Sequence, residues 1–422
     1  MARLCLGLAA ALAICSPAAA RAEWSPPQQV SHVQAQLETP RLAFDGKGHV
    51  FAAWDESAHR NLYASVGSGR PQLLGDDVVL DDLSASRNGS VLVVATGRNG
   101  RGGRIETYVR SPGGRFRASQ VLDRIPRPYA YLHHALLGSD PAGDAVVVWT
   151  RARRRHPDSP LFIALRHHGG RFGRARAISK TGVGAFTLAM NPSGQFVVAW
   201  ARNVAVEARV GRGNKLGPVR RVGIVNTAVP EVVTAAIDNA GDSLLAWLGT
   251  TNVELAYRQA GFGFETPRGL PHDQSAGFGG HMGLAFTSNE HALLALDGSN
   301  SQGAGIFAFD VFQGVPSSAV SLSSSTPSPG LGPRLQGVAA GPRGQVVITW
   351  AALRAGAGYT GPSDLFASYG DTVGFSPPEQ VSAPDTPLAD TSGFPVATVR
   401  FDPVGKPVAL WVADRIETST RR

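Results

Sequence analysis

The sequence has very little cysteine: it contains two residues, Cys5 and Cys15, and both lie near the N-terminus. They fall in a segment with an early arginine, a short apolar run and an Ala-Arg-Ala pattern that ends at residue 22. These features are typical of a secretory signal peptide, so we expect residues 1–22 to be removed. Without cysteine, residues 23–422 can form no disulfide and no cysteine-ligated metal site, and their hydrophobic core must supply the stability.

Long apolar runs are also missing. The run from residue 4 to residue 14 is too short to cross a bilayer as a helix, and no other run approaches about 18 residues. We therefore expect a soluble exported chain, secreted or held in the periplasm or cell envelope, without a transmembrane segment. One alternative is an uncleaved N-terminal anchor. Another is lipid attachment at Cys15 in "LAIC", although Ile14 departs from the small residue that such motifs prefer.

Lysine is rare, so arginine carries nearly all of the positive charge. With 40 basic and 32 acidic residues, the formal net charge is +8, and the basic residues are spread along the chain. This distribution makes nucleic acid a poor candidate partner, whereas an anionic polymer of the cell envelope would be attracted. The sequence also lacks a Gly-x-Ser-x-Gly elbow, a phosphate-binding Walker loop and a His-Glu-x-x-His zinc motif.

What the sequence does contain is an internal repeat. Each copy is interpreted as a strand, a turn of the form Asp-x-x-Gly, and a second, continuously apolar strand that ends in tryptophan. Two weaker copies, at residues 83–95 and 284–296, lack the tryptophan. The six clear copies are residues 42–54, 136–149, 188–200, 235–247, 338–350 and 399–411.

The turn in each copy uses residue types with defined conformational roles. Asp or Asn at the first position bonds back to the backbone, proline at the second position presets φ, and glycine at the fourth position accepts a positive φ. We interpret the aspartates as turn caps rather than calcium ligands, because one carboxylate per turn is too few for a calcium site. These aspartates are Asp45, Asp140, Asp238 and Asp402.

Two further strands follow in each unit, so that each unit is a four-stranded meander with a period of about 51 residues. This period predicts an all-β fold, a β-propeller with eight four-stranded blades, with seven blades as the alternative. The repeated tryptophans end buried strands, so we expect them to pack between blades rather than to form a sugar-binding platform. They are Trp54, Trp149, Trp200, Trp247, Trp350 and Trp411.

The first and last segments are expected to close the ring. "EWSPPQQVS" at residues 23–31 nearly copies the fourth strand "GFSPPEQVS" at residues 374–382. The eighth unit ends with its third strand, "RIETSTR" at residues 415–421, and lacks a fourth strand. We therefore expect residues 23–31 to complete the last blade of a single domain, which removes the open sheet edges. An open β-solenoid of the same repeats is the structural alternative.

These repeats resemble those of exported bacterial β-propellers that are grouped loosely with sialidase-like and NHL-like proteins. The resemblance covers essentially all of residues 23–422, but it is architectural. Trp54 lies six residues after Gly48, which does not match the spacing of a sialidase Asp box. "DRIP" at residues 123–126 differs from the Phe/Tyr-Arg-Ile-Pro motif that supplies a sialidase arginine, so Arg124 is a weak candidate. Propellers include enzymes, receptors and scaffolds, and the resemblance therefore implies the fold and not the activity.

Candidate ligand-binding residues lie near the starts of the innermost strands, which line one mouth of a propeller's central channel. If these polar side chains converge, they form a ligand site; otherwise they are independent residues at loop ends. His134 and His281 alone would lack a third ligand at a recognisable spacing, so we predict no metal site from them. The candidates are Arg41, Asp82, His133, His134, Glu231, His281 and Arg334.

Two charged segments are interpreted as surface loops. "GDDVVLDD" at residues 75–82 places four carboxylates before the inner strand of the second unit, where calcium binding is the alternative to a solvated loop. Residues 151–156 and 166–176 are strongly basic and are expected on opposite faces of the ring. They are solvated loops or contacts for an anionic polysaccharide or lipid. We predict no required cofactor.

The leading functional prediction is non-catalytic binding of an extracytoplasmic glycan or protein by a monomer. The alternative is a carbohydrate-active hydrolase or lyase at the channel mouth, with paired carboxylates supplied by the acidic segment and Glu231. Convergent carboxylates would favour the enzyme, and a channel lined by small residues would favour the binding module. The small residues in question are Ala43, Ser84, Ala189, Ala236 and Ala339.

Overall fold

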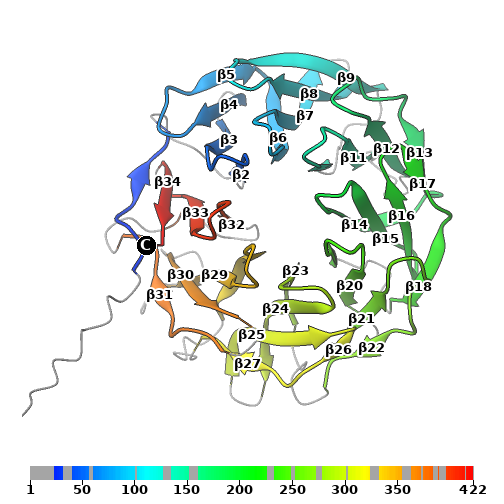
Figure 1. Ribbon diagram of the computed structural model, residues 1–422, viewed down its shortest axis with the longest axis vertical. Coiled ribbons are helices and arrows are strands. Elements are labelled where there is room, and N and C mark those ends of the chain that lie inside the picture. The colour runs from blue at the N-terminus through cyan, green and yellow to red at the C-terminus, as the bar shows by residue number, and fades with distance from the viewer. Residues whose placement is uncertain are drawn as a thin grey trace, which may run out of the picture.

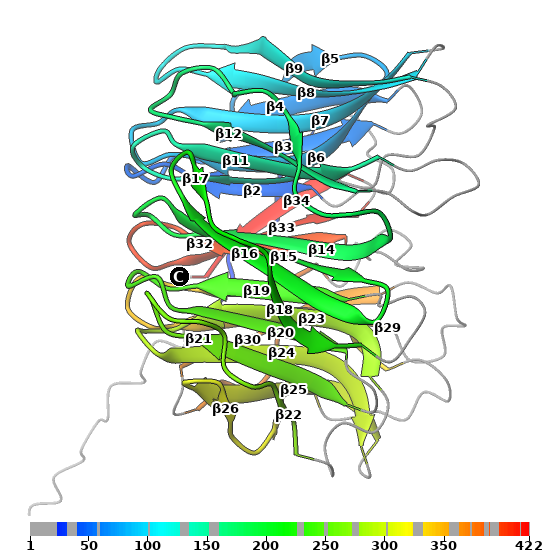
Figure 2. The ribbon, with the colours of Figure 1, turned by 90° about the vertical axis from the view of Figure 1, so that its right-hand side faces the viewer.

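The strands fold as antiparallel four-stranded meanders, and eight of these meanders surround a central channel (Figure 1). The chain is therefore an eight-bladed β-propeller, which confirms the predicted fold class and the higher of the two predicted blade numbers. Figure 2 shows the ring from its side, with the strands running roughly along the ring axis. In the part of the chain that the structure describes, no helix is long and apolar enough to cross a membrane.

The computed structural model describes most of the chain after the leader, and the leader itself, residues 1–22, lies outside the described residues. The described ranges are 23–31, 40–56, 60–99, 102–126, 135–151, 160–225, 232–248, 252–271, 278–300, 303–323, 332–353, 363–371, 374–383, 388, 396–413 and 415–421.

The first four blades each run from an inner strand beside the channel to an outer strand at the rim. Blade 1 contains β2 (Arg41–Phe44), β3 (Val50–Glu56), β4 (Asn61–Val66) and β5 (Gln72–Gly75). Blade 2 contains β6 (Val78–Ala85), β7 (Val91–Asn99), β8 (Gly102–Arg110) and β9 (Phe116–Pro126). Blade 3 contains β10 (Leu136–Ser139), β11 (Ala145–Thr150), β12 (Leu161–Arg166) and β13 (Arg176–Ala177). Blade 4 contains β14 (Val183–Met190), β15 (Gln195–Arg202) and β16 (Ala205–Arg212), with its outer strand in two pieces, β17 (Lys215–Leu216) and β18 (Arg220–Ile224).

The second half of the ring repeats this order. Blade 5 contains β19 (Val233–Ile237), β20 (Ser243–Leu248), β21 (Val253–Arg258) and β22 (Arg268–Gly269). Blade 6 contains β23 (Phe278–Phe286), β24 (His291–Asn300), β25 (Gly303–Phe312), β26 (Val315–Pro316) and β27 (Val320–Ser321). Blade 7 contains β28 (Arg334–Ala340), β29 (Val346–Leu353), β30 (Ser363–Gly370) and β31 (Glu379–Gln380). Blade 8 contains β32 (Ala397–Phe401), β33 (Pro407–Val412), β34 (Ile416–Thr420) and the N-terminal β1 (Gln28–Gln29).

The two weak repeats form blades 2 and 6, but one prediction about blade 2 is wrong. The inner strand β6 begins at Val78, so Asp81 and Asp82 lie inside it rather than in a solvated acidic loop. Asp81 is buried and accepts a hydrogen bond from Thr96 Oγ1 at 2.7 Å. A bulge between Leu80 and Asp82 interrupts the register of the strand at these two aspartates. Only Asp76 and Asp77 precede the strand and are exposed.

The repeated tryptophans pack between blades, as predicted. All six indoles are almost fully buried, at the end of the second strand of their blades. Several stack on the aromatic side chain that faces them on the third strand; Trp54 and Tyr63, for example, have ring centroids 6.1 Å apart. A buried aromatic side chain of this size contributes about 3–5 kcal/mol to stability. The tryptophans therefore stabilise the ring and offer no exposed ring face to a sugar.

Two of these indoles donate to a carboxylate that also binds an arginine. Glu207 accepts Trp200 Nε1 at 2.9 Å and Arg202 Nη2 at 2.6 Å within blade 4. Asp123, on the outer strand of blade 2, accepts Trp149 Nε1 of blade 3 at 3.0 Å. The hydrogen bond from Arg202 lowers the pKa of Glu207 despite its partial burial, which on its own would raise it.

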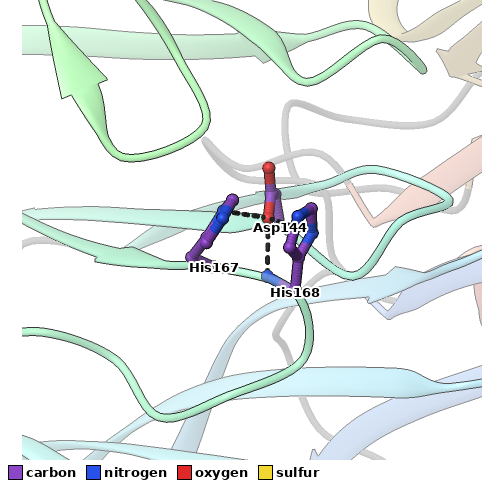
Figure 3. Close-up of side chains that lie close together, drawn as sticks. All are labelled: Asp144, His167 and His168. Atoms are coloured by element: carbon purple, nitrogen blue, oxygen red, sulfur yellow. Dashed lines mark hydrogen bonds and ion pairs between the residues drawn. The ribbon is translucent and has the colours of Figure 1, made fainter.

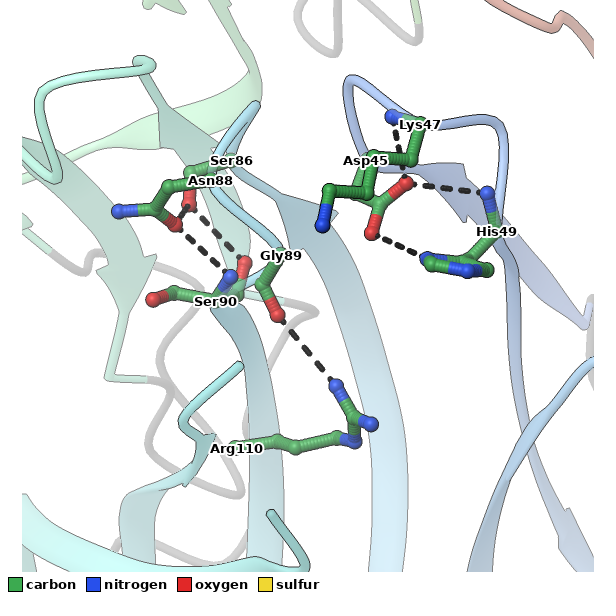
Figure 4. Close-up of polar contacts among 8 residues, drawn as sticks. All are labelled: Asp45, Lys47, His49, Ser86, Asn88, Gly89, Ser90 and Arg110. Carbon is green, nitrogen blue, oxygen red and sulfur yellow. Dashed lines mark hydrogen bonds and ion pairs between the residues drawn. The ribbon is translucent and has the colours of Figure 1, made fainter. Parts of the chain in front are cut away.

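The Asp-x-x-Gly turns close the first hairpin of blades 1, 3, 5 and 8 by the predicted capping bonds, which Figure 4 shows for blade 1. Asp45 Oδ1 accepts the backbone N–H groups of Lys47 at 2.9 Å and His49 at 3.0 Å. Burial would raise the pKa of Asp45, but the hydrogen bonds from His49 and Lys47 outweigh burial and hold this pKa below its ordinary value. Gly48 has φ = 82°, where a side chain would be strained. In the next blade Asn88 takes the role of the aspartate by accepting the Ser90 N–H.

The N-terminal segment completes blade 8, which confirms the predicted closure. Gln28 lies opposite Thr418 and Gln29 opposite Glu417 in an antiparallel pair, and the blue β1 lies beside the red β34 in Figure 1. Trp24 forms a further bridge with Arg421. Both Trp24 and Val30 pack against the hydrophobic cluster that blade 8 shares with blades 1 and 7. The first and last segments of the described chain are therefore joined by hydrogen bonds and by a shared core.

A buried serine follows the outer strand in several blades. Its role explains why both residues 23–31 and residues 374–382 end in serine. Ser31 Oγ accepts the Ile416 N–H at 2.9 Å, and Ser382 Oγ accepts the Leu365 N–H at 3.0 Å. The hydroxyl satisfies a backbone donor at the start of the third strand, where the outer strand has no further backbone acceptor to offer. Ser179 and Ser323 do the same for Leu161 and Ile306.

We expect Ser31→Ala to lower the free energy of unfolding by about 1–3 kcal/mol, because the buried Ile416 amide loses its acceptor. Ser382→Ala should cost a similar amount, since it removes the equivalent bond in blade 7. The control is Ser318→Ala at an exposed position. Urea unfolding measures all three variants, and an unchanged stability for Ser31→Ala would contradict the closure described above.

We expect Glu207→Gln to destabilise the fold by about 1.5–3 kcal/mol at neutral pH, because the indole and guanidinium lose a charged acceptor. Since the folded-state pKa of Glu207 is lowered, its contribution is present above the unfolded pKa and is lost as the pH falls through the folded pKa. The difference between wild type and variant should therefore shrink below the ordinary carboxyl pKa of 4.5. Thermal unfolding from pH 7 to pH 3 measures this stability difference. A difference that stays constant over this range would contradict the role of Glu207 as a charged acceptor.

Candidate functional site

The inner strands of blades 8, 1, 2, 3 and 4 enclose a cavity of about 520 Å³ on the channel wall. Its charged lining consists of Arg41 on β2, Asp82 on β6 and Arg400 on β32. These residues are far apart in the sequence and meet because every blade presents its first strand to the channel. A cavity of this size suits a small ligand or one or two sugar units.

Asp82 is the best-connected residue of this cavity. Its Oδ2 accepts the Leu137 N–H of blade 3 at 2.9 Å, and its Oδ1 accepts the Leu83 N–H at 2.8 Å. The side chain is only 20% exposed, and this burial raises the pKa of Asp82 although the charges of Arg41 and Arg400 oppose the rise. Asp82 thus ties blade 2 to blade 3 and carries the negative charge of the site.

The two arginines give the cavity an excess of positive charge. Arg41 Nε lies 3.8 Å from Asp82 Oδ1 and donates to the Asp81 carbonyl at 3.1 Å. Arg400 is exposed to the channel and donates through Nη1 to the Val399 carbonyl at 3.1 Å; the atoms packed around its guanidinium lower the pKa of this group, with Asp82 acting in the opposite direction. The described lining thus holds two guanidinium groups and one carboxylate. This excess of positive charge in a concave site favours an anion.

The remaining lining is mixed, and this corrects part of the prediction of a small-residue channel. Ala43 and Ser84 do line the cavity, and Ser84 Oγ lies 2.6 Å from Ser139 Oγ of the next blade. By contrast, Ala236 and Ala339 are buried, because alternate residues of a strand point to opposite faces. Ala189 packs against the hydrophobic cluster between blades 4 and 5. Larger side chains also line the cavity: Phe44, Leu188, Met190 and Phe401.

His281 and Asp297 form a second polar cluster, between blades 6 and 7. His281 Nδ1 lies 2.7 Å from Asp297 Oδ2, and its backbone N–H donates to Asp297 Oδ1 at 2.9 Å. The same Asp297 accepts the Leu335 N–H at 3.3 Å, next to Arg334 at the start of β28. Asp297 is buried and ties blade 6 to blade 7 as Asp82 ties blade 2 to blade 3. Neither His281 nor Arg334 lines the cavity that holds Arg41 and Asp82.

Three predicted residues, His133, His134 and Glu231, lie outside the described residues. Arg124 lies on the outer strand β9, where it is exposed and faces Arg104, so it is not part of the channel site. Sequence reasoning missed Arg400 and Asp297. Arg400 directly follows an apolar residue in an inner strand, and this alternation indicates a side chain that faces the channel. Nothing in the sequence links Asp297 to His281.

Comparison with known proteins supports the fold and gives no family. No protein-family model matches this chain, and no curated protein matches it. Among solved structures, the Dos1 propeller is 10% identical, with 94% of this chain and 95% of that chain covered and a TM-score of 0.56. The fucose-specific lectin from Aleuria aurantia is 11% identical, with 69% of this chain and 97% of that chain covered and a TM-score of 0.40. The α-L-arabinofuranosidase Arb93A from Fusarium graminearum is 12% identical, with 69% of this chain and 96% of that chain covered and a TM-score of 0.38. At 10% identity, the match to the Dos1 propeller shows a shared β-propeller fold alone.

We expect Asp82→Ala to destabilise the fold by about 1–3 kcal/mol, because the Leu137 amide loses its acceptor and Arg41 and Arg400 lose their counter-charge. Asp82→Asn should cost less, because the amide oxygen can still accept one of the two N–H groups. In a double-mutant cycle, Arg400→Gln should partly offset Asp82→Ala, since it removes the unbalanced cation. Urea unfolding measures the cycle, and strict additivity would contradict the electrostatic coupling.

Proposed function

We propose that the protein is an exported, non-catalytic binding module that takes an acidic glycan in its central channel. The observation that carries this proposal is the cavity containing Arg41, Arg400 and Asp82, in which two guanidinium groups face a single carboxylate. Arginine binds carboxylates and sulfates through paired hydrogen bonds, and the serine pair Ser84–Ser139 supplies hydroxyl groups for a sugar. The size of the cavity favours a glycan over a protein partner.

The bonding of Asp82 favours binding over hydrolysis. Both of its oxygens already accept backbone N–H groups, so the carboxylate is held as part of the framework. Glycoside hydrolysis needs two carboxyl groups on either side of the scissile bond. Asp82 is the one carboxylate among the described residues that line the cavity. A glycosidase would need a second carboxyl group from elsewhere, and Glu231 is the sequence candidate.

Export supports the choice of ligand class. From the leader features at residues 1–22 we infer export to a compartment where envelope and extracellular polysaccharides are the abundant anionic polymers. Removal of Arg3 and Arg21 with the leader lowers the formal net charge from +8 to +6, which still adds a long-range attraction to such polymers.

A glycan array probed with the protein, with and without calcium, tests the function directly. We expect binding to glycans that carry carboxylate or sulfate groups, independent of calcium and weakened by salt because the contacts are ionic. Incubation of the bound glycan with the protein and an assay for released reducing ends separates the binding module from the enzyme. Absence of acidic glycans among the bound ligands would refute the proposal, and released sugar would favour the glycosidase.

We expect Arg400→Gln to weaken binding of the acidic glycan by about tenfold or more, because one charge-assisted hydrogen bond in a concave site is lost. Arg41→Gln should act in the same direction. Arg124→Gln is the matched control, since it removes an exposed arginine from the rim without touching the cavity. Isothermal titration calorimetry measures the three variants, and equal loss in the control would show that only net charge matters.

A further inference from the structure

Two turns of blade 3 bring one carboxylate and two imidazoles together (Figure 3). Asp144 follows the first-hairpin turn at Gly143, and His167 and His168 lie in the turn between β12 and β13. In an antiparallel meander these two connections lie at the same end of the blade. The Gly169 N–H donates to the Gly143 carbonyl at 2.9 Å, which holds the two turns together.

The three side chains point at one another. His167 Nδ1 lies 2.9 Å and His168 Nδ1 lies 3.4 Å from the same oxygen, Asp144 Oδ1. The two rings are stacked, with centroids 3.7 Å apart and planes inclined by 30°. Asp144 is buried, whereas the imidazoles are about half exposed. The cluster thus combines a fixed carboxylate with two accessible nitrogen donors.

We propose that Asp144, His167 and His168 form a binding site for a divalent transition metal, with Zn²⁺ as the ion that fits best. Ligand atoms around a tetrahedral Zn²⁺ with bonds of about 2.0–2.1 Å lie about 3.3 Å from one another. The distance from His168 Nδ1 to Asp144 Oδ1 has this value, and that from His167 Nδ1 needs only a small increase. Two imidazoles and one carboxylate are donors that suit zinc rather than calcium. The exposed side of the cluster leaves a fourth position for water or a ligand atom.

Blade 5 shows which part of this arrangement the fold requires. Asp242 occupies the position of Asp144 and caps the equivalent turn, accepting the Ala260 N–H at 2.7 Å. Its second oxygen, Oδ2, accepts the Tyr257 hydroxyl at 2.5 Å. In blade 3 the tyrosine is replaced by Leu165, and no residue in the described part of the chain donates to Asp144 Oδ2. The blade 3 carboxylate therefore has a free oxygen and two histidines where blade 5 has a complete structural cap.

The other blades show that neither the carboxylate nor the histidine pair is needed to close these turns. In six other blades the residue that follows the turn is not an aspartate, although all six form the same hairpin. The equivalent residues are His49, Ser90, Gln195, His291, Gln345 and Lys406. The combination in blade 3 thus has no counterpart in the repeat pattern and is better explained by a local role.

The backbone of the turn follows the repeat. His168 has φ = 46°, and Gln313 at the equivalent position of blade 6 has φ = 47°, so this left-handed conformation belongs to the turn between the third and fourth strands. In blade 3 it places the His168 ring beside that of His167 on the same carboxylate. Arg166 opposes metal binding: it holds the turn by donating to the Gly169 and Gly170 carbonyls, and it places a cation nearby. The site is therefore expected to bind zinc less tightly than a closed structural site does.

Zinc titration of the untagged protein by calorimetry tests this site. We expect the wild type to bind Zn²⁺, and His167→Ala, His168→Ala and Asp144→Asn each to weaken binding at this site by at least about tenfold, since each removes a direct ligand or its charge. Asp242→Asn in blade 5 is the matched control and should leave zinc binding unchanged. Asp144→Asn keeps an oxygen that can accept the His168 N–H, so its unfolding temperature in EDTA should stay close to that of the wild type.

A second readout identifies the ligands. Bound Cu²⁺ should show hyperfine coupling to two imidazole nitrogens in its electron paramagnetic resonance spectrum, and His167→Ala should reduce this to one. Zinc binding that is equal in the wild type and all three site variants would overturn the proposal, because the ion would then lie elsewhere. Failure of the wild type to bind Zn²⁺ or Cu²⁺ would overturn it as well.

Discussion

The structure depends on the pairing of its first strand with its last. A ring of blades in which each sheet packs only on its neighbours would otherwise have two free ends, one before blade 1 and one after blade 8. The pairing of Gln28 and Gln29 with β34 closes that gap with backbone hydrogen bonds, and Trp24 and Val30 add apolar contacts. Because the closure joins residues almost 400 positions apart, it also fixes the relative positions of the channel-lining strands of blades 8 and 1.

The contacts between blades show how polar residues on the first two strands of a blade can be structural and functional at once. Asp82, Asp297 and Gln336 each accept a backbone N–H group from the next blade, which satisfies a donor at the edge of that blade. Only at Asp82 do two arginines from other blades join the carboxylate. The proposed ligand site thus arises where an ordinary inter-blade contact coincides with an excess of positive charge.

The fold could be predicted from the sequence because its determinants are local and repeated. The turn residues, the tryptophan that ends the second strand in six of the eight repeats, and the near-copy of residues 374–382 at residues 23–31 each indicate local structure. Because the pattern repeats, it indicates the same structure around the whole ring. The site could be predicted only in part. The position of inner strands suggested Arg41 and Asp82, but the pairing of His281 with Asp297 and the approach of Arg400 to Asp82 are contacts between distant residues that no local pattern encodes. Asp81 and Asp82 looked like a solvated cluster because a strand bulge leaves no sequence pattern.

Cross-linking in the cysteine-free chain 23–422 tests the closure most directly. Gln29 and Glu417 face each other across the β1–β34 pair, so Gln29→Cys with Glu417→Cys places two thiols within the range of a disulfide. We predict that this pair oxidises readily and raises the unfolding temperature, whereas the offset pair Gln28→Cys with Glu417→Cys stays largely reduced because its side chains point to opposite faces. Free thiols in both variants, measured in the folded protein, would contradict a ring closed by its N-terminal strand.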